Sequence, residues 1–270
     1  LSQIEFPNQK ERILVEQPTY HRINDLLLAQ KLPYETIERT PQGINLQELE
    51  RIFQSGKIKF FYTIPRFHYP LGHSYSRQDK EEILRLAQLY DVYIVEDDYL
   101  SDFDSRRELT FHYLDNSQRV IYIKSFSTSL FPALRITALL FPPQIQKTFI
   151  AYKSAVDYDS NLIMQKALSL YIDSLMFEKN RLALLQLQEE EARKAQILLE
   201  QAQLPLASYL TKDGILLDLR SLSSVSALKH SSLSLDFFEQ SYLASCPYQY
   251  AKLPYDNLEE NIEKLKDYLK

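Results

Sequence analysis

Short apolar, β-branched runs alternate with segments of helical periodicity through the first half of the chain. The runs predict strands over 12–16, 34–39, 59–63, 91–95 and 119–123, and one more strand that Phe141-Pro142 closes. Apolar residues at helical spacing predict helices over 19–30, over 45–55 with Asn45 as cap, and over 76–90 with Ser76 as cap. This alternation is typical of βαβ units and predicts an α/β fold.

The pattern changes after Pro143. Helices are predicted over 144–156, 161–175 and 178–203, which are free of interior proline and glycine. Beyond them, strands over 215–219 and 248–252 and helices over 233–243 and 257–269 predict a small α+β unit. We therefore predict a large domain over 1–157, connecting helices over 158–203 and a small C-terminal domain over 204–270.

Composition narrows the class of protein. The chain has 270 residues, of which 45% are hydrophobic, enough for a substantial core. Its one cysteine, Cys246, excludes an intrachain disulfide, and neither a bilayer-length apolar stretch nor a signal peptide is evident, so we expect a cytoplasmic protein. A net charge of −5 without a basic cluster predicts that this segment alone does not bind DNA and does not act on membranes.

Polar residues follow two neighbouring predicted strands. Glu96-Asp97-Asp98-Tyr99 ends one strand, and Lys124-Ser125-Phe126-Ser127-Thr128 ends the next. The carboxyl ends of strands in such sheets face the ligand crevice, where a carboxylate can neutralise a cation and a tyrosine can donate to an oxyanion. Pyridoxal phosphate (PLP) needs both, at its ring nitrogen and its phenolic oxygen. Ser125 and Arg135 suit its phosphate.

These segments resemble a known family. Ile-Val-Glu-Asp-Asp-Tyr, then Tyr-Ile-Lys-Ser-Phe-Ser-Thr-Ser-Leu-Phe-Pro-Ala-Leu-Arg, with Val-Glu-Gln-Pro-Thr-Tyr near the start and Arg-Phe-His-Tyr-Pro-Leu-Gly between, resemble the aminotransferase-like domain of MocR regulators, a subfamily of GntR transcription regulators. The match runs over residues 13–142. It implies a PLP-dependent aminotransferase-like (fold type I) large domain with a mainly parallel sheet, a homodimer, and a separate DNA-binding winged helix.

The resemblance also implies roles for single residues. Asp97 stands where the family pairs the pyridine nitrogen, Tyr99 where it bonds the ring oxygen, and Ser125 and Arg135 where it holds phosphate. A glycine-rich phosphate loop precedes the matching segment in the family. With four glycines in all, the chain is expected to begin inside a domain whose amino-terminal part lies upstream.

Three positions depart from the family pattern. Thr128 stands where the lysine should be, and a hydroxyl forms no Schiff base and shuttles no substrate proton. Tyr69 replaces the asparagine of an Asn-Pro-x-Gly turn, with a bulk that would fill part of the ring's space. Pro247 aligns with the arginine that binds substrate carboxylate, and it offers no charge.

Structural readings of the same residues stay open. Lys124 is expected to be a solvated strand-end lysine and not a substitute amine. Asp97 and Asp98 are equally residues that cap or begin a turn, and Arg135 is equally a buried partner of Asp97. His68 and His73 read as loop histidines, because no cysteine or carboxylate lies at metal-ligand spacing.

We interpret the chain as the effector-binding and dimerising domain of a MocR/GntR-type regulator, a pseudoenzyme with no catalytic residue and a vestigial pocket at Asp97, Tyr99, Ser125, Arg135 and Tyr69. No cofactor is expected to be covalently bound, no metal is expected, and non-covalent PLP or a related phosphate is the weaker expectation. The alternatives are a PLP-dependent aminotransferase or lyase with a divergent or engineered lysine position, and a structural dimer module without ligand.

Overall fold

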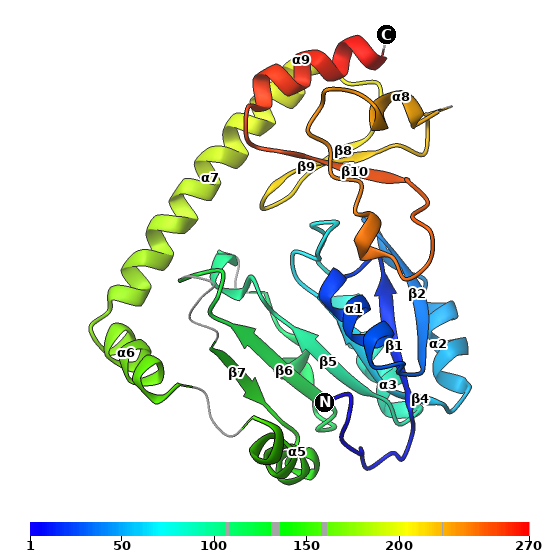
Figure 1. Ribbon diagram of the computed structural model, residues 1–270, viewed down its shortest axis with the longest axis vertical. Coiled ribbons are helices and arrows are strands. Elements are labelled where there is room, and N and C mark those ends of the chain that lie inside the picture. The colour runs from blue at the N-terminus through cyan, green and yellow to red at the C-terminus, as the bar shows by residue number, and fades with distance from the viewer. Residues whose placement is uncertain (106–107, 131–135, 158–160, 223, 270) are drawn as a thin grey trace.

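The computed structural model describes residues 1–105, 108–130, 136–157, 161–222 and 224–269, which form two sheets joined by a long helix (Figure 1). The large sheet has the strand order β3-β2-β1-β4-β5-β6-β7. Neighbours from β2 to β6 pair in parallel, and β3 and β7 pair antiparallel at the two edges. The strands are β1 (Arg12–Gln17), β2 (Tyr34–Thr40), β3 (Gly43–Ile44), β4 (Ile58–Thr63), β5 (Tyr93–Asp97), β6 (Val120–Ser125) and β7 (Thr137–Leu140).

Five described helices accompany these strands, and all but the one-turn α4 lie at predicted places. They are α1 (His21–Ala29), α2 (Leu46–Gln54), α3 (Arg77–Leu89), the one-turn α4 (Phe111–Leu114) and α5 (Pro143–Val156), with a 3-10 turn η1 (Ser101–Phe103) after β5. Asn45 accepts from the Glu48 amide at 3.0 Å, and Ser76 and Asp79 form a reciprocal capping box. Both predicted caps are therefore confirmed.

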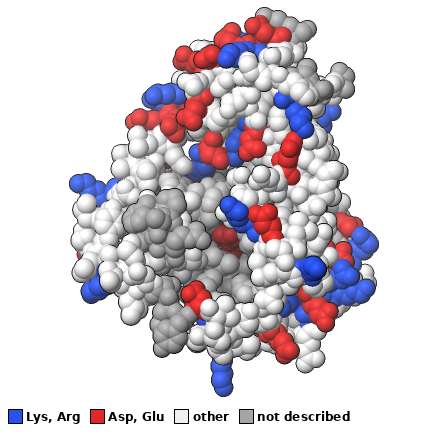
Figure 2. All heavy atoms as spheres, in the orientation of Figure 1, with Lys and Arg blue, Asp and Glu red and all other residues white. Residues whose placement is uncertain are grey.

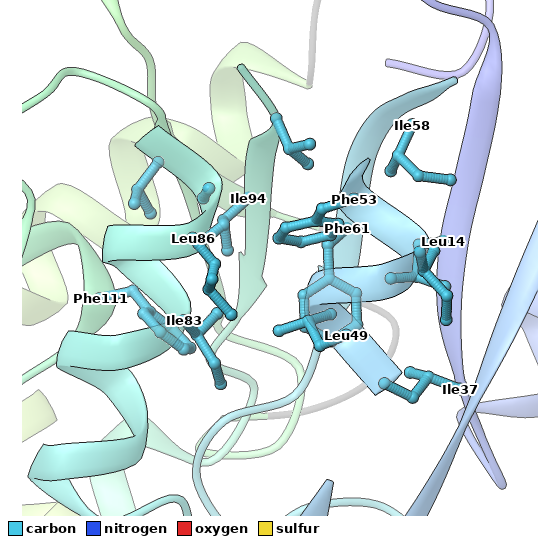
Figure 3. Packing of buried hydrophobic residues seen from close by; sticks show 14 of the residues in the cluster. Leu14, Ile37, Leu49, Phe53, Ile58, Phe61, Ile83, Leu86, Ile94 and Phe111 are labelled. Carbon is cyan, nitrogen blue, oxygen red and sulfur yellow. The ribbon is translucent and has the colours of Figure 1, made fainter. Parts of the chain in front are cut away.

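Each central strand is apolar on both faces, and its residues alternate between two cores. Leu14, Phe61 and Ile94 pack under α2 and α3 in one core, which Figure 3 shows from close by. Their strand neighbours pack on the other face, with Leu27 of α1 and Ile145 of α5. Because successive side chains of a strand point to opposite faces, this alternation fixes the face of every residue at the strand ends.

The small sheet is antiparallel, with β9 between its two neighbours. Its strands are β8 (Ser208–Leu210), β9 (Gly214–Asp218) and β10 (Tyr250–Pro254). The other elements of this half are α6 (Leu162–Asp173), α7 (Met176–Ala202), α8 (Ser226–Lys229), the 3-10 turn η3 (Glu239–Ser241) and α9 (Leu258–Leu269). Ala195 and Ala202 of α7 and Ile262 of α9 share the core of the small sheet.

The predicted helix over 233–243 is wrong. The backbone around Asp236 is extended, and the Asp236 amide donates to the Lys252 carbonyl at 3.0 Å while the Lys252 amide donates back at 2.8 Å. Only η3 is helical within that segment. Pairing with the edge of β10 therefore overrides an apolar pattern that was compatible with a helix. The predicted limits of the domains at 157 and 203 stay predictions.

The two sheets meet closely at Gly72. This residue has a left-handed φ of +72°, and a Cβ placed on it would lie 2.3 Å from Cγ2 of Thr211, in the turn after β8. Any other residue would collide there, so glycine is required for the contact. Leu71 packs beside it with Leu216 and Phe238 from the small sheet's half. None of the described helices has the length and apolar content to cross a membrane.

Candidate functional site

The acidic end of β5 divides between the two faces of the large sheet. Tyr93 and Val95 belong to the core that α1 and α5 cover, so the two-residue period places Asp97 on that face. Ile94 belongs to the opposite core, so Glu96 and Asp98 follow it there. Adjacent residues of one strand end therefore meet different partners.

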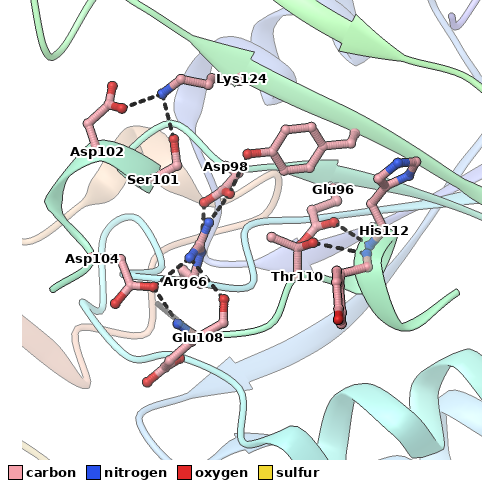
Figure 4. Close-up of polar contacts among 12 residues, drawn as sticks. Arg66, Glu96, Asp98, Ser101, Asp102, Asp104, Glu108, Thr110, His112 and Lys124 are labelled. Atoms are coloured by element: carbon pink, nitrogen blue, oxygen red, sulfur yellow. Dashed lines mark hydrogen bonds and ion pairs between the residues drawn. The ribbon is translucent and has the colours of Figure 1, made fainter. Parts of the chain in front are cut away.

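Asp98 lies in an ionic group with Arg66 and Asp104, all three of them buried (Figure 4). Together with the half-buried Tyr122, these residues are here called the Arg66 cluster. The Arg66 guanidinium pairs with both Asp98 oxygens, and its Nη1 donates to Asp104 at 2.6 Å. The Tyr122 hydroxyl donates to Asp98 at 2.8 Å. Burial lowers the pKa of Arg66, but the hydrogen bonds and charge of Asp98 outweigh it, so the pKa is raised. The cluster is a structural unit in which one guanidinium pairs with two carboxylates.

Glu96 anchors the short helix α4. Its two carboxylate oxygens accept from the Phe111 and His112 amides, each at 2.9 Å. Burial raises the Glu96 pKa to about 7, although both amide bonds act to lower it. Glu96 therefore holds a loop in place and does not face the side of Asp97.

Asp97 lies on the opposite face with aromatic neighbours. The Tyr62 hydroxyl, from β4, donates to its Oδ2 at 2.6 Å. Burial raises the Asp97 pKa to about 6, and the Tyr62 hydrogen bond offsets only part of that effect. Tyr99 follows Asp97 by two residues and donates from its hydroxyl to the Phe67 carbonyl at 3.1 Å. We call Asp97, Tyr62, Tyr99 and Tyr69 the Asp97 group.

The turn after β6 reaches the end of β5. The Thr128 hydroxyl donates to the Tyr99 carbonyl at 2.7 Å, and Ser125 Oγ accepts from the Ser127 amide at 3.2 Å. Thr128 therefore lies directly beside the residue that the resemblance assigns to the cofactor oxygen. Arg135 falls outside the described residues.

Lys124 is not the solvated lysine that the sequence predicted. It shares the strand face of Tyr122, and its ammonium lies 2.7 Å from both Asp102 Oδ1 and Ser101 Oγ (Figure 4). Its side chain is 20% exposed. Because β6 ends at Ser125, the amine stays on the face opposite to Asp97.

Tyr69 contacts both halves of the molecule. Its ring stands at 89° to the ring of Tyr20, with 5.9 Å between centroids, and the Lys252 ammonium lies 5.4 Å from its centroid. Burial raises the Tyr69 pKa to about 12, so the phenol is neutral. Pro247, the expected substitute for a carboxylate-binding arginine, is exposed.

Lys252 was missed from the sequence. It is buried on β10, and its ammonium donates to Asp213 Oδ1 at 2.8 Å and Oδ2 at 2.7 Å. The available signal was a lysine between Ala251 and Leu253 in a predicted strand, because a charge inside an apolar run needs a partner.

A second buried ionic group was also missed. Glu16 of β1 accepts from Arg39 Nη1 at 3.3 Å and from the Tyr75 hydroxyl at 2.6 Å, and His68 Nε2 lies 3.3 Å from its other oxygen. Burial raises the Glu16 pKa, but Arg39 and His68 outweigh it and hold the pKa at about 2. His68 is therefore a buried partner of Glu16, and the described residues include no group of three potential metal-binding side chains.

The described side chains do not fit a PLP held through an imine. Lys124 is the one lysine in the turn over 124–130, and its amine is on the wrong face. Tyr99 and Ser125 already have partners within the protein, and Asp97 has Tyr62. No reaction step through the cofactor follows from this geometry.

Comparison with known proteins confirms the resemblance. The chain is 46% identical over 177 residues to an uncharacterised helix-turn-helix regulator, YcxD of Bacillus subtilis, covering 65% of this chain and 40% of that protein. It is 30% identical over 203 residues to the probable rhizopine catabolism regulatory protein MocR of Rhizobium meliloti, covering 74% and 39%. The chain thus spans about two fifths of the length of these relatives. No protein-family model matches.

Among solved structures, the chain is similar to the kynurenine aminotransferase of Pyrococcus horikoshii. The TM-score is 0.82 at 24% identity, covering 96% of this chain and 69% of the other. Aminotransferases also occur among the relatives by sequence. The fold is therefore that of the fold-type-I aminotransferases, as predicted, and the relatives by sequence include HTH-type transcription regulators.

Proposed function

We propose that the chain is the effector-binding and dimerising part of a MocR/GntR-type transcription regulator and that it does not catalyse transamination. The observation that carries the proposal is Thr128, whose hydroxyl lies 2.7 Å from the Tyr99 carbonyl, at the place where the resemblance requires an amine. A hydroxyl cannot form the imine or move the substrate proton. The kinship with regulators supports the same conclusion.

In this proposal the chain senses an effector because the effector binds two arrangements of the protein with different affinities. A ligand that binds one arrangement of the two sheets better than another shifts the population between them, and a second copy of the chain transmits the shift to attached DNA-binding modules. Apolar side chains exposed on and between the outer helices support a dimer, among them Val156 at 67%, Ile163 at 79% and Leu175 at 72% exposure. Analytical ultracentrifugation of the chain is expected to show a dimer.

DNA binding is assigned to a module outside this chain. On the face that Figure 2 shows, lysine and arginine are interspersed with aspartate and glutamate, and the net charge is −5. A phosphate backbone calls for a continuous basic surface. The proposed site of action is the cytoplasm.

The test of lost attachment is PLP incubation followed by borohydride reduction and peptide mapping. The native chain is expected to carry no label in the segment 124–136 or on Lys252, whose amine is bound to Asp213. Thr128→Lys should acquire a reducible imine at the new amine, while Ser127→Lys, one residue away, serves as control for non-specific labelling. Label in the native turn or on Lys252 would overturn the proposal.

An enzyme with a replaced lysine is the second candidate, because the similar solved structures are aminotransferases. Thr128→Lys also separates the two readings. Transamination restored by this one substitution favours the enzyme. An imine without turnover favours the regulator, because Tyr69 and Pro247 still depart from the family pattern.

A further inference from the structure

A cavity of about 560 Å³ lies between the two sheets, and none of the residues of the Asp97 group lines it. Its walls come from the loop after β4, the segment after η1, helix α7 and the turn after β8. Volumes of this size hold small metabolites. A ligand there would contact both halves of the molecule at once.

The two halves of the molecule contribute opposite charges to the cavity lining. Asp104 and Glu108 come from the large-sheet half, and Lys212 comes from the small-sheet half. Asp104 is already paired with Arg66, at 2.6 Å. The Glu108 carboxylate is different, because its ion pair with Lys80 among the described residues is long, at 3.8 Å, and its side chain is 35% exposed. It keeps capacity to accept hydrogen bonds from an ammonium.

The remaining lining suits an apolar side chain and neutral hydrogen-bonding groups. The ring of Phe67 forms part of the wall, with the Lys212 ammonium 4.7 Å from its centroid. Burial lowers the pKa of His73 to about 4, so its imidazole is neutral near pH 7.

We propose that this cavity binds a zwitterionic amino compound of amino-acid size, with its ammonium at Glu108 and its carboxylate at Lys212. Its binding is a property of this chain alone, but its role as effector rests on the proposed regulatory function. By contacting the loop around Gly72 and the turn that carries Thr211, the ligand would favour the arrangement of the sheets seen in this structure.

Titration calorimetry on the chain tests the site, with the protein amino acids as millimolar probes. At least one should bind, and its decarboxylated amine and deaminated acid should each bind roughly tenfold more weakly or not at all. Glu108→Gln and Lys212→Met should each cost roughly tenfold in affinity. Glu190→Gln, an exposed change on α7, should leave the affinity unchanged.

Two results would overturn the cavity as the site. One is the absence of binding by every amino acid. The other is binding that survives Glu108→Gln and Lys212→Met but is lost in Asp97→Asn and Tyr99→Phe, which moves the ligand to the Asp97 group and leaves the regulatory proposal standing. Conversely, cavity binding without any change in operator binding by the full-length protein would disprove the regulatory role and keep the site.

Discussion

The Arg66 cluster and the Asp97 group start from adjacent residues of β5 and differ in how their charge is balanced. Asp98 is paired with the buried Arg66 guanidinium and accepts a hydrogen bond from the Tyr122 hydroxyl. Asp97 meets the Tyr62 hydroxyl, and its pKa rises to about 6 because burial is only partly offset. The paired carboxylate of Asp98 stabilises the fold. Asp97 is desolvated without a cationic partner among the described residues, and a ligand that brings a positive charge or a hydrogen-bond donor could supply one.

The largest expected effect comes from breaking the closed cluster. Arg66→Met leaves Asp98 and Asp104 buried without their cation, which should lower the free energy of unfolding by about 3–5 kcal/mol. Arg85→Met is the matched control, because Arg85 makes a similar two-bond pair with Glu82 on the exposed surface of α3. Urea denaturation should show a change close to zero there. Similar losses of unfolding free energy in Arg66→Met and Arg85→Met would contradict the distinction between the buried cluster and a surface ion pair.

A smaller effect is expected at Asp97, and it depends on pH. The folded-state pKa of about 6 lies above the ordinary 3.8, so the unfolded chain releases this proton first and stability falls as pH rises through about 4 to 6. The loss is at most about 3 kcal/mol. Asp97→Asn should remove this slope. Glu96, with a pKa near 7, should keep its own decline in the variant.

Denaturation curves collected across that pH range measure the pH dependence of stability in the native chain and in Asp97→Asn. An unchanged slope between pH 4 and 6 in Asp97→Asn would show that Asp97 is not desolvated as described. Glu16 is expected to show the opposite trend. Its folded-state pKa of about 2 lies below the ordinary 4.5, so its contribution to stability is lost as pH falls from about 4.5 to 2.

The smallest effect is expected from removing the tyrosine hydroxyls that donate to Asp97 and Asp98. Tyr62→Phe removes the hydrogen bond that stabilises ionised Asp97, so the Asp97 pKa should rise further, with a loss of about 1 kcal/mol in stability at neutral pH. Tyr122→Phe removes the corresponding bond to Asp98 and should leave the Asp97 titration unchanged. Carbon-13 NMR of aspartate carboxyls follows the titration, and equal shifts of the Asp97 pKa in both variants would refute the separation of faces.

The hydrophobic periodicity and the helix-capping residues predicted most of the fold. The strands from 12–16 to 119–123 and the caps Asn45 and Ser76 follow from local sequence, because each element is specified by its own residues. The prediction of a helix over 233–243 was wrong because the conformation of this segment depends on pairing with the edge of β10, which is remote in sequence. The three-residue strand β8 is too short to show a period.

The candidate site was predicted less completely. Asp97, Tyr99 and Thr128 were expected together, and Thr128 does reach Tyr99. Glu16 and Arg39 were not recognised as partners, because β1 and β2 bring them together only in the folded sheet. The opposite fates of Asp97 and Asp98 depended on partners from β4, β6 and a loop, which no local pattern reveals.

The absence of a side chain at Gly72 has a mechanical consequence. Thr211 rests so closely on that backbone that the two halves cannot slide past one another there without separating. Rocking of the small sheet would preserve the contact only if its axis passed near this point. A residue without chemistry of its own would then act as the pivot about which the cavity widens or narrows.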